Sequence, residues 1–200
     1  MNLPSAFLDA NALYGIYIRD ALLEFAAAKL FIPHWSAGVV AELTGALERN
    51  LRSSRKSLDA LTAALESAFP FASVKAGEVR AKELEGVHAG DRHVLAAALT
   101  AHCDYLVTFN TKHFPQATMA SQGIELITPD AFLVKLSTSN RGNALRVITQ
   151  LIASYTNPQL DALTYSSALS KSQCTGFAAF IEAHAALIDT TRASSRPARG

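Results

Sequence analysis

The sequence predicts an α/β fold: a three-layer α/β/α sandwich around a mostly parallel sheet, followed by a helical C-terminal extension. Short apolar segments of strand length alternate with longer helical segments over about residues 1–135, which is the pattern of parallel strands joined by helices. Beyond residue 143 the chain has only helical patterns. We therefore expect a sandwich domain at 1–136, a helical extension at 144–189 and a disordered tail at 190–200.

Five segments are candidates for strands. DYLVTF is the clearest, because it is apolar on both faces, as a central parallel strand requires. FASVK is the weakest of the five. In chain order they are SAFLD (5–9), LFIP (30–33), FASVK (71–75), DYLVTF (104–109) and GIELITP (123–129).

Helical segments fill the intervals between these strands. Gly15 is a possible break in the first of them, and Ser36 is a good N-cap for the second. The stretch STSNRGN, residues 137–143, has the composition of a linker. The expected helical segments are 11–29, 37–51, 54–69, part of 76–90, 91–103 and 129–136, and then most of 144–189.

Composition is that of a folded protein, with 50% hydrophobic and 18% charged residues. No apolar stretch approaches the roughly 18 residues of a membrane span, and residues 1–15 lack the basic start of a secretory signal. We therefore expect a cytoplasmic protein without a membrane partner. Cys103 and Cys174 are far apart in sequence and are expected to be buried thiols. A net charge of +1 neither requires nor excludes nucleic acid.

Polar side chains follow the predicted strands where ligands bind in parallel sheets. Asp9 ends the first strand, Asn110 follows DYLVTF, and Glu42 lies in the first two turns of the helix after LFIP. Asp91 opens the helix that leads into DYLVTF. Because the carboxyl ends of parallel strands share one edge of the sheet, we expect these four residues to converge.

Each of these residues also has an ordinary structural explanation. Asp9 or Asp91 alone could simply cap a helix, Glu42 could be a solvated helix residue, and Asn110 could be a turn residue. Independent caps, however, have no reason to share an edge of the sheet. The combination therefore favours a functional site.

Three stretches resemble the PIN domain, and in particular the VapC-type toxins of prokaryotic toxin–antitoxin pairs. They are FLDANALY, VVAELTGAL around Glu42, and GDRHVLAAAL followed by DYLVTFNTKHFP, within about residues 5–132. The resemblance implies an RNA endonuclease that depends on Mg²⁺ or Mn²⁺ and has Asp9, Glu42 and Asp91 as metal carboxylates. It also implies an RNA substrate, a cognate antitoxin and a homodimer.

The chemistry of these residues agrees with the resemblance, because hard divalent cations prefer carboxylate oxygens and activate water for phosphodiester cleavage. Many PIN domains have a fourth acid after the last buried strand, whereas this chain has Asn110, with Thr108 as an auxiliary residue. Asp104 begins the same strand, roughly 20 Å away, and cannot replace that acid. The six histidines are scattered without zinc-site spacing, and most of them are expected to be surface or core residues.

Arg49, Arg52 and Lys56 would form one stripe at i, i+3 and i+7 if the helix of Glu42 continued that far. Such a stripe could hold the RNA backbone through its phosphates, or it could be an ordinary solvated face.

Two other functions are possible. A non-catalytic PIN-fold RNA-binding or scaffold protein is the main alternative, because Asn110 is neutral. A phosphoacceptor receiver domain is disfavoured, because Asp9 is followed by Ala10 rather than by a second acid.

Overall fold

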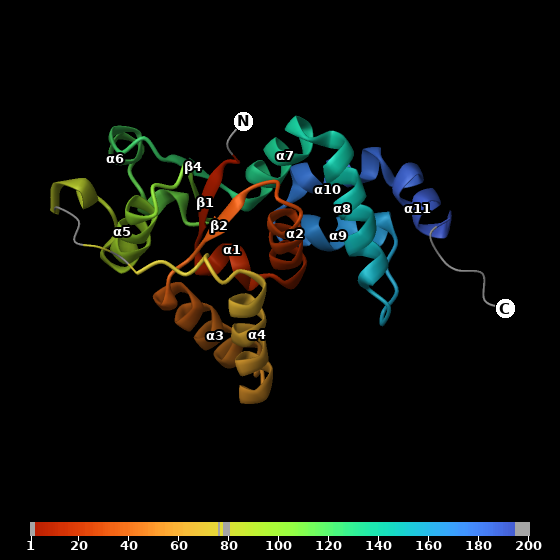
Figure 1. The fold of residues 1–200 in the computed structure, drawn as a ribbon, viewed down its shortest axis with the longest axis horizontal. Helices are drawn as coiled ribbons and strands as arrows, with labels where there is room; N and C mark the ends of the chain where they lie inside the picture. Colours follow the sequence, from red (N-terminus) through yellow and green to blue (C-terminus); the bar gives the residue numbers. More distant parts are fainter. Residues whose placement is uncertain (1–2, 76, 78–80, 195–200) are drawn as a thin grey trace. The chain divides into compact units, whose positions relative to one another are not determined.

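The computed structural model describes residues 3–75, 77 and 81–194 (Figure 1). The chain divides into two compact units. Unit 1 comprises Met1–Gly15 and Phe31–Thr128, and unit 2 comprises Ile16–Leu30 and Pro129–Gly200. The second unit therefore includes a helix from the N-terminal region as well as the C-terminal helices. The predicted domain limits at 136 and 144 stay a prediction.

Unit 1 is built on a parallel sheet of four short strands with the order β2-β1-β3-β4. In the central strands β1 and β3, the residues after the first are all apolar and buried, as expected for strands covered on both faces. The predicted α/β fold with a parallel sheet and a helical C-terminal region is confirmed. The strands are β1 (Ser5–Leu8), β2 (Ile32–His34), β3 (Tyr105–Val107) and β4 (Glu125–Ile127).

The segment FASVK was wrongly predicted as a full strand. It makes one parallel bridge, between Trp35 and Ser73. Two backbone hydrogen bonds hold it there: Trp35 N–H donates to Ala72 O (3.0 Å) and Val74 N–H donates to Trp35 O (2.7 Å). Ala72 is 3% exposed, but Phe71 on the other face is 91% exposed, so the segment is not covered on both faces as a central strand would be.

Two helices of unit 1 have an end that the sequence predicted. Ser36 Oγ accepts a hydrogen bond from Val39 N–H (3.2 Å) and caps α3, and Gly15 ends α1, as both were expected to do. α5 contacts β1 and β3, and α3 contacts α1 and α4. The helices are α1 (Ala10–Tyr14), α3 (Ala37–Leu51), α4 (Arg55–Ala68), α5 (Arg92–Thr100) and α6 (Gln116–Ser121), with short 3-10 helices η1 (Ala81–Leu84), η2 (Ala89–Asp91) and η3 (Thr111–His113).

Unit 2 is a group of helices around a buried apolar core. α10 contacts both α7 and α9, and α2 contacts α7, α8 and α9. Phe25 of α2 and Phe177 of α10 are buried and meet edge to face. The helices are α2 (Ile16–Ala27), α7 (Pro129–Ser139), α8 (Arg141–Ser154), α9 (Ala162–Lys171), α10 (Thr175–Ala183) and α11 (Ala185–Ser194).

Asp130 of α7 holds the start of α10. Its two carboxylate oxygens accept hydrogen bonds from Gly176 N–H (3.0 Å) and Phe177 N–H (2.7 Å), two N–H groups in the first turn of α10. A Cβ at position 176 would lie 3.0 Å from Asp130 Oδ2, so the glycine permits this close approach.

The linker predicted at residues 137–143 is helical except at Asn140. Thr138 and Ser139 continue α7, and their hydroxyls donate to the carbonyl oxygens of Val134 (2.7 Å) and Lys135 (2.9 Å). Ser and Thr side chains that bond to the preceding turn are compatible with a helix, and composition alone does not reveal this.

The disordered tail predicted at 190–200 falls partly on residues 195–200, which lie outside the described residues, while α11 continues to Ser194. Among the helices of the described chain, we find none that is both long enough and apolar enough to cross a membrane. The cytoplasmic location stays a prediction.

Candidate metal and nuclease site

Asp9 is both a helix cap and a buried carboxylate at the edge of the sheet. Its N–H donates to Val107 O (3.1 Å), so its backbone continues the pairing of β1 with β3. Its Oδ1 accepts a hydrogen bond from Ala10 N–H (2.7 Å) at the start of α1, and the residue is only 3% exposed. The capping explanation is therefore correct, but it does not account for the second oxygen.

The second oxygen of Asp9 is bound by two side chains. Thr108 Oγ1 donates to Asp9 Oδ2 (2.7 Å), and the amide nitrogen of Asn11 donates to the same oxygen (2.6 Å). Asn11 also accepts the backbone N–H of Phe109 through its Oδ1 (2.8 Å), so it links α1 to the end of β3. The sequence analysis did not identify Asn11, although its place two residues after Asp9 could have indicated it.

These surroundings act on the pKa of Asp9 in opposite directions. Burial raises the pKa most, the hydrogen bonds from Thr108 and Ala10 lower it, and the charge of Asp91 raises it again. The net effect is a raised pKa. Asp9 is therefore a desolvated carboxylate that another acidic group also repels.

Glu42 faces the same group from α3. Burial raises its pKa most, the nearby His93 lowers it, and the charges of Asp9 and Asp91 raise it. Its side chain is 50% exposed, so water screens part of these interactions. The three predicted carboxylates are therefore close enough to influence one another, as the sequence predicted.

His93 lies beside Glu42 and was not identified from sequence. Its Nε2 is 3.3 Å from Glu42 Oε1, but the angles are not those of a hydrogen bond, so the contact is an ion pair only when the ring is protonated. A Cβ at Gly38, one turn before Glu42, would lie 3.4 Å from the His93 ring. The same face of α3 thus meets the first turn of α5.

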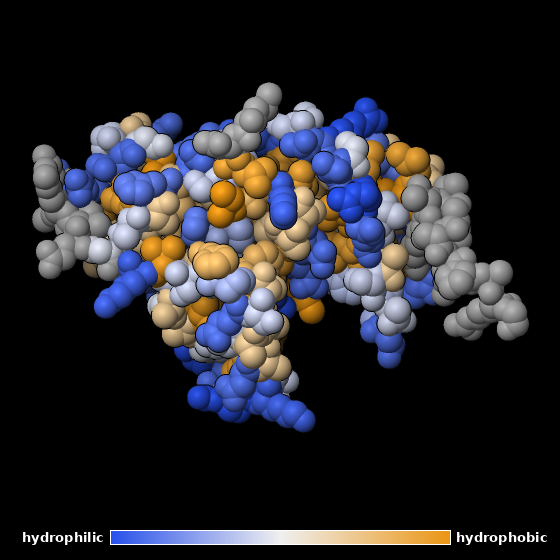
Figure 2. Space-filling view, viewed as in Figure 1, coloured by the Kyte–Doolittle hydropathy of each residue, from blue (hydrophilic) through white to orange (hydrophobic). Residues whose placement is uncertain are grey.

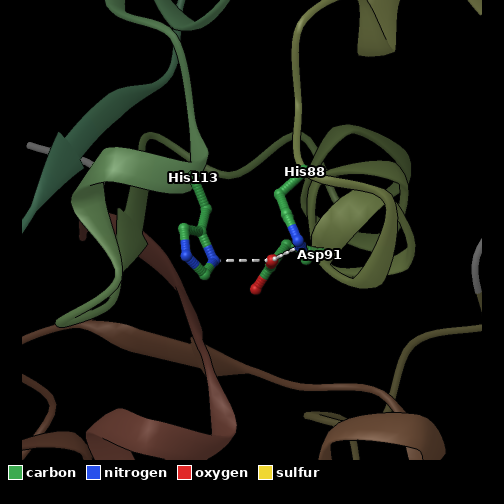
Figure 3. Close-up of side chains that lie close together, drawn as sticks. All are labelled: His88, Asp91 and His113. Atoms are coloured by element: carbon green, nitrogen blue, oxygen red, sulfur yellow. Dashed lines mark hydrogen bonds and ion pairs between the residues drawn. The ribbon is translucent and has the colours of Figure 1, made fainter.

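Asp91 precedes α5 but does not cap it with its side chain. Its Oδ2 lies 3.0 Å from His88 Nδ1 and 2.9 Å from His113 Nδ1 (Figure 3). Three groups that could hold a metal ion thus come together, although the sequence spacing gave no indication of it. The expectation that the histidines are ordinary surface or core residues does not describe these two.

Asn110 lies at the same edge of the sheet, and it is exposed. Its N–H donates to Thr108 Oγ1 (3.0 Å), and it precedes η3 without a side-chain cap. Asp104 accepts hydrogen bonds from Ser5 N–H (2.8 Å) and Ser5 Oγ (2.9 Å) at the opposite end of β3, which agrees with its exclusion from the site. A catalytic role of Asn110 stays a prediction.

The single helical stripe of Arg49, Arg52 and Lys56 was wrongly predicted. α3 ends at Leu51, and Arg52 has a positive φ of 52°, which stops the helix. Lys56 lies in α4, a separate helix. The three residues are exposed, and their binding of RNA stays a prediction.

Comparison with protein families agrees with this geometry. Residues 5–112, more than half of the chain, match the PIN domain family model. The chain belongs to the PIN domain family. A second model, the VapC50 C-terminal domain, matches residues 129–183 of this PIN-domain chain and begins where α7 begins.

A Mycobacterium tuberculosis protein described as "Putative ribonuclease VapC50" is 35% identical to this PIN-domain chain over 71 residues. The aligned stretch covers 36% of this chain and 42% of that relative. The similarity to this VapC protein is therefore confined to less than half of its length.

Proposed function

We propose that the chain is an endoribonuclease that depends on Mg²⁺ or Mn²⁺ and acts as the toxin of a toxin–antitoxin pair. One observation carries the proposal. Asp9, Glu42 and Asp91 come from three separate elements of a PIN domain at the carboxyl edge of the sheet. The charge of Asp91 adds to the raised pKa of Asp9, and the charges of Asp9 and Asp91 add to the raised pKa of Glu42. Carboxylates that repel one another at a ligand-binding edge are typical of a cation site.

The donor set fits a hard divalent ion. Three carboxylates give a formal charge of about −3, and oxygen ligands suit Mg²⁺ and Mn²⁺. When bound, such an ion supplies an activated water and offsets the charge that develops on the phosphate. Thr108 and Asn11 orient Asp9. Asn110, whose backbone N–H donates to Thr108 Oγ1, would add a neutral side-chain amide.

The RNA backbone would extend toward the end of the α3–α4 pair. Hydrophilic residues gather at this tip (Figure 2). Arg49, Arg52 and Lys56 are exposed where the chain turns from α3 to α4, although not as one helical stripe. Phosphate contacts from such residues position the backbone without reading its sequence.

The toxin assignment rests on the similarity to a VapC protein and to its C-terminal domain. It includes a cognate antitoxin as partner, a homodimer and a cytoplasmic location. Expression of the chain alone should arrest growth, and co-expression of the protein encoded beside it should restore growth.

The direct test is RNA cleavage by the purified protein with Mg²⁺ or Mn²⁺. Asp9→Asn and Asp91→Asn should abolish cleavage, because each removes a negative charge from the site. Asp59→Asn is the matched control, because Asp59 is 69% exposed on α4, where it pairs with Arg55.

Cleavage in excess chelator, or full activity of both site variants, would contradict the proposal. Tight RNA binding without cleavage under all metal conditions would instead favour the non-catalytic alternative.

A further inference from the structure

We propose that His88, Asp91 and His113 form a second cation site. It binds a divalent transition-metal ion of the class that prefers imidazole ligands, and Zn²⁺ is the ion used to test it. The two imidazoles and one carboxylate place three ligand atoms within 4.8 Å of one another. This donor set differs in kind from the all-oxygen group of Asp9 and Glu42. Nitrogen donors favour zinc and its neighbours over Mg²⁺.

The spacing of the ligand atoms is close to what such an ion needs. In a tetrahedral site with bonds of about 2.0–2.1 Å, neighbouring ligand atoms are roughly 3.3 Å apart. The two histidine Nδ1 atoms lie 3.0 Å and 2.9 Å from Asp91 Oδ2. Small shifts of the side chains would therefore open the group around an ion. The side chains of His88 and His113 are 61% and 41% exposed, so an ion can reach them.

The backbone brings the two histidines together independently of their side chains. His88 N–H donates to His113 O (3.0 Å), and Asp91 N–H donates to His88 O (2.9 Å). Gly86 has a positive φ of 74°, and a Cβ there would lie 2.8 Å from Pro115 Cγ, so this loop lies tightly against the segment after His113. Ligands held in this way lose little freedom when an ion binds.

Two groups lie within hydrogen-bond distance of His88 Nδ1. Gly90 N–H points at His88 Nδ1 (3.3 Å), which requires a lone pair, whereas Asp91 Oδ2 at 3.0 Å requires a proton on the same nitrogen. One nitrogen cannot satisfy both. Gly90 N–H and Asp91 Oδ2 therefore compete for the same ring nitrogen.

Asp91 connects this site to the other carboxylates. Its Oδ2 faces both rings, and its second oxygen points away from them (Figure 3). One carboxylate can therefore serve an ion on each side. This sharing rests on the proposed function, whereas the His88–Asp91–His113 site does not.

The test is Zn²⁺ binding by the full chain without RNA, measured by calorimetry after treatment with a chelator. Wild type should bind Zn²⁺ in the presence of excess Mg²⁺. His88→Ala and His113→Ala should each weaken binding by more than the roughly 10–100-fold that an outer partner of a metal ligand contributes. His102→Asn is the control, because His102 is an exposed histidine with a φ of 51° that asparagine tolerates.

A second measurement does not depend on variants. Added Zn²⁺ should shift the ring NMR signals of His88 and His113 in the wild-type protein and leave those of His102 unchanged. Zn²⁺ affinity that is equal in wild type and the His88→Ala/His113→Ala double variant would overturn the inference. An Asp9→Asn variant that cannot cut RNA but binds Zn²⁺ normally would support the inference of a separate zinc site. Wild-type protein that binds Zn²⁺ but never cuts RNA would contradict only the proposed function.

Discussion

The hydroxyl of Thr108 should contribute measurably to the stability of unit 1, because it is fully buried and donates to a charged oxygen. Thr108→Val preserves shape but removes the hydrogen bond to Asp9 Oδ2 (2.7 Å). A hydrogen bond to a charged group contributes about 1.5–3 kcal/mol. The valine also leaves Asn110 N–H without its partner, but Asn110 is exposed and water can replace it. We therefore expect a loss of about 2–3 kcal/mol in the free energy of unfolding.

Urea unfolding at pH 7 with a chelator present measures this loss. Thr108→Ser keeps the hydroxyl and removes one buried methyl, which should cost about 1 kcal/mol. Thr62→Val is the matched control, because the Thr62 hydroxyl donates to Leu58 O one turn earlier in α4 and its loss should change stability by less than about 0.5 kcal/mol. Equal losses in Thr108→Val and Thr108→Ser would refute the argument, because the hydroxyl would then contribute nothing.

Three further predictions concern other parts of the chain. Arg49→Ala with Arg52→Ala should weaken RNA binding and reduce the slope of log binding constant against log salt concentration by about 1.4, because two phosphate contacts are lost. Arg141→Ala with Arg146→Ala removes the same charge from α8 and is the control. An equal effect of both pairs would exclude a local role of Arg49 and Arg52. Burial raises the pKa of Cys103 and of Cys174 to about 12, so both thiols stay protonated at pH 8. Both should therefore react with a thiol reagent only after the protein unfolds. Rapid reaction of the native protein would contradict this. Asp130→Ala leaves Gly176 N–H and Phe177 N–H without their acceptors, so thermal unfolding should show a free energy of unfolding that is lower by about 1–3 kcal/mol. Asp59→Ala is the control and should lower it by less than about 0.5 kcal/mol. A similar loss in both variants would show that Asp130 does not stabilise α10.

The sequence predicted the features that depend on local pattern. The apolar run of β3, the break at Gly15 and the cap at Ser36 each follow from a few adjacent residues, and all are found. The convergence of Asp9, Glu42 and Asp91 followed from strand order, because parallel strands place their carboxyl ends together. That these carboxylates bind metal still rests on the resemblance and on the proposal.

The features that were missed depend on contacts between distant residues. His88 and His113 meet because two loops, 25 positions apart, are tied by a backbone hydrogen bond that no periodicity reveals. The prediction of one helical stripe through Lys56 was wrong because Arg52 adopts a left-handed conformation that ends the helix. An arginine in the sequence gives no indication of this conformation. The linker at 137–143 was predicted from composition, whereas the hydroxyls of Thr138 and Ser139 bond to the preceding turn of α7.

The hydrogen bonds around Asp9 also limit how it can hold an ion. A carboxylate offers about four lone-pair positions, and three are occupied by Ala10 N–H, the Asn11 amide and the Thr108 hydroxyl. One position is left, so Asp9 can coordinate through a single oxygen but cannot chelate with both unless a protein bond breaks. Asp9 is thus limited to monodentate coordination, and the further ligands of an ion would have to come from Glu42, Asp91 and water.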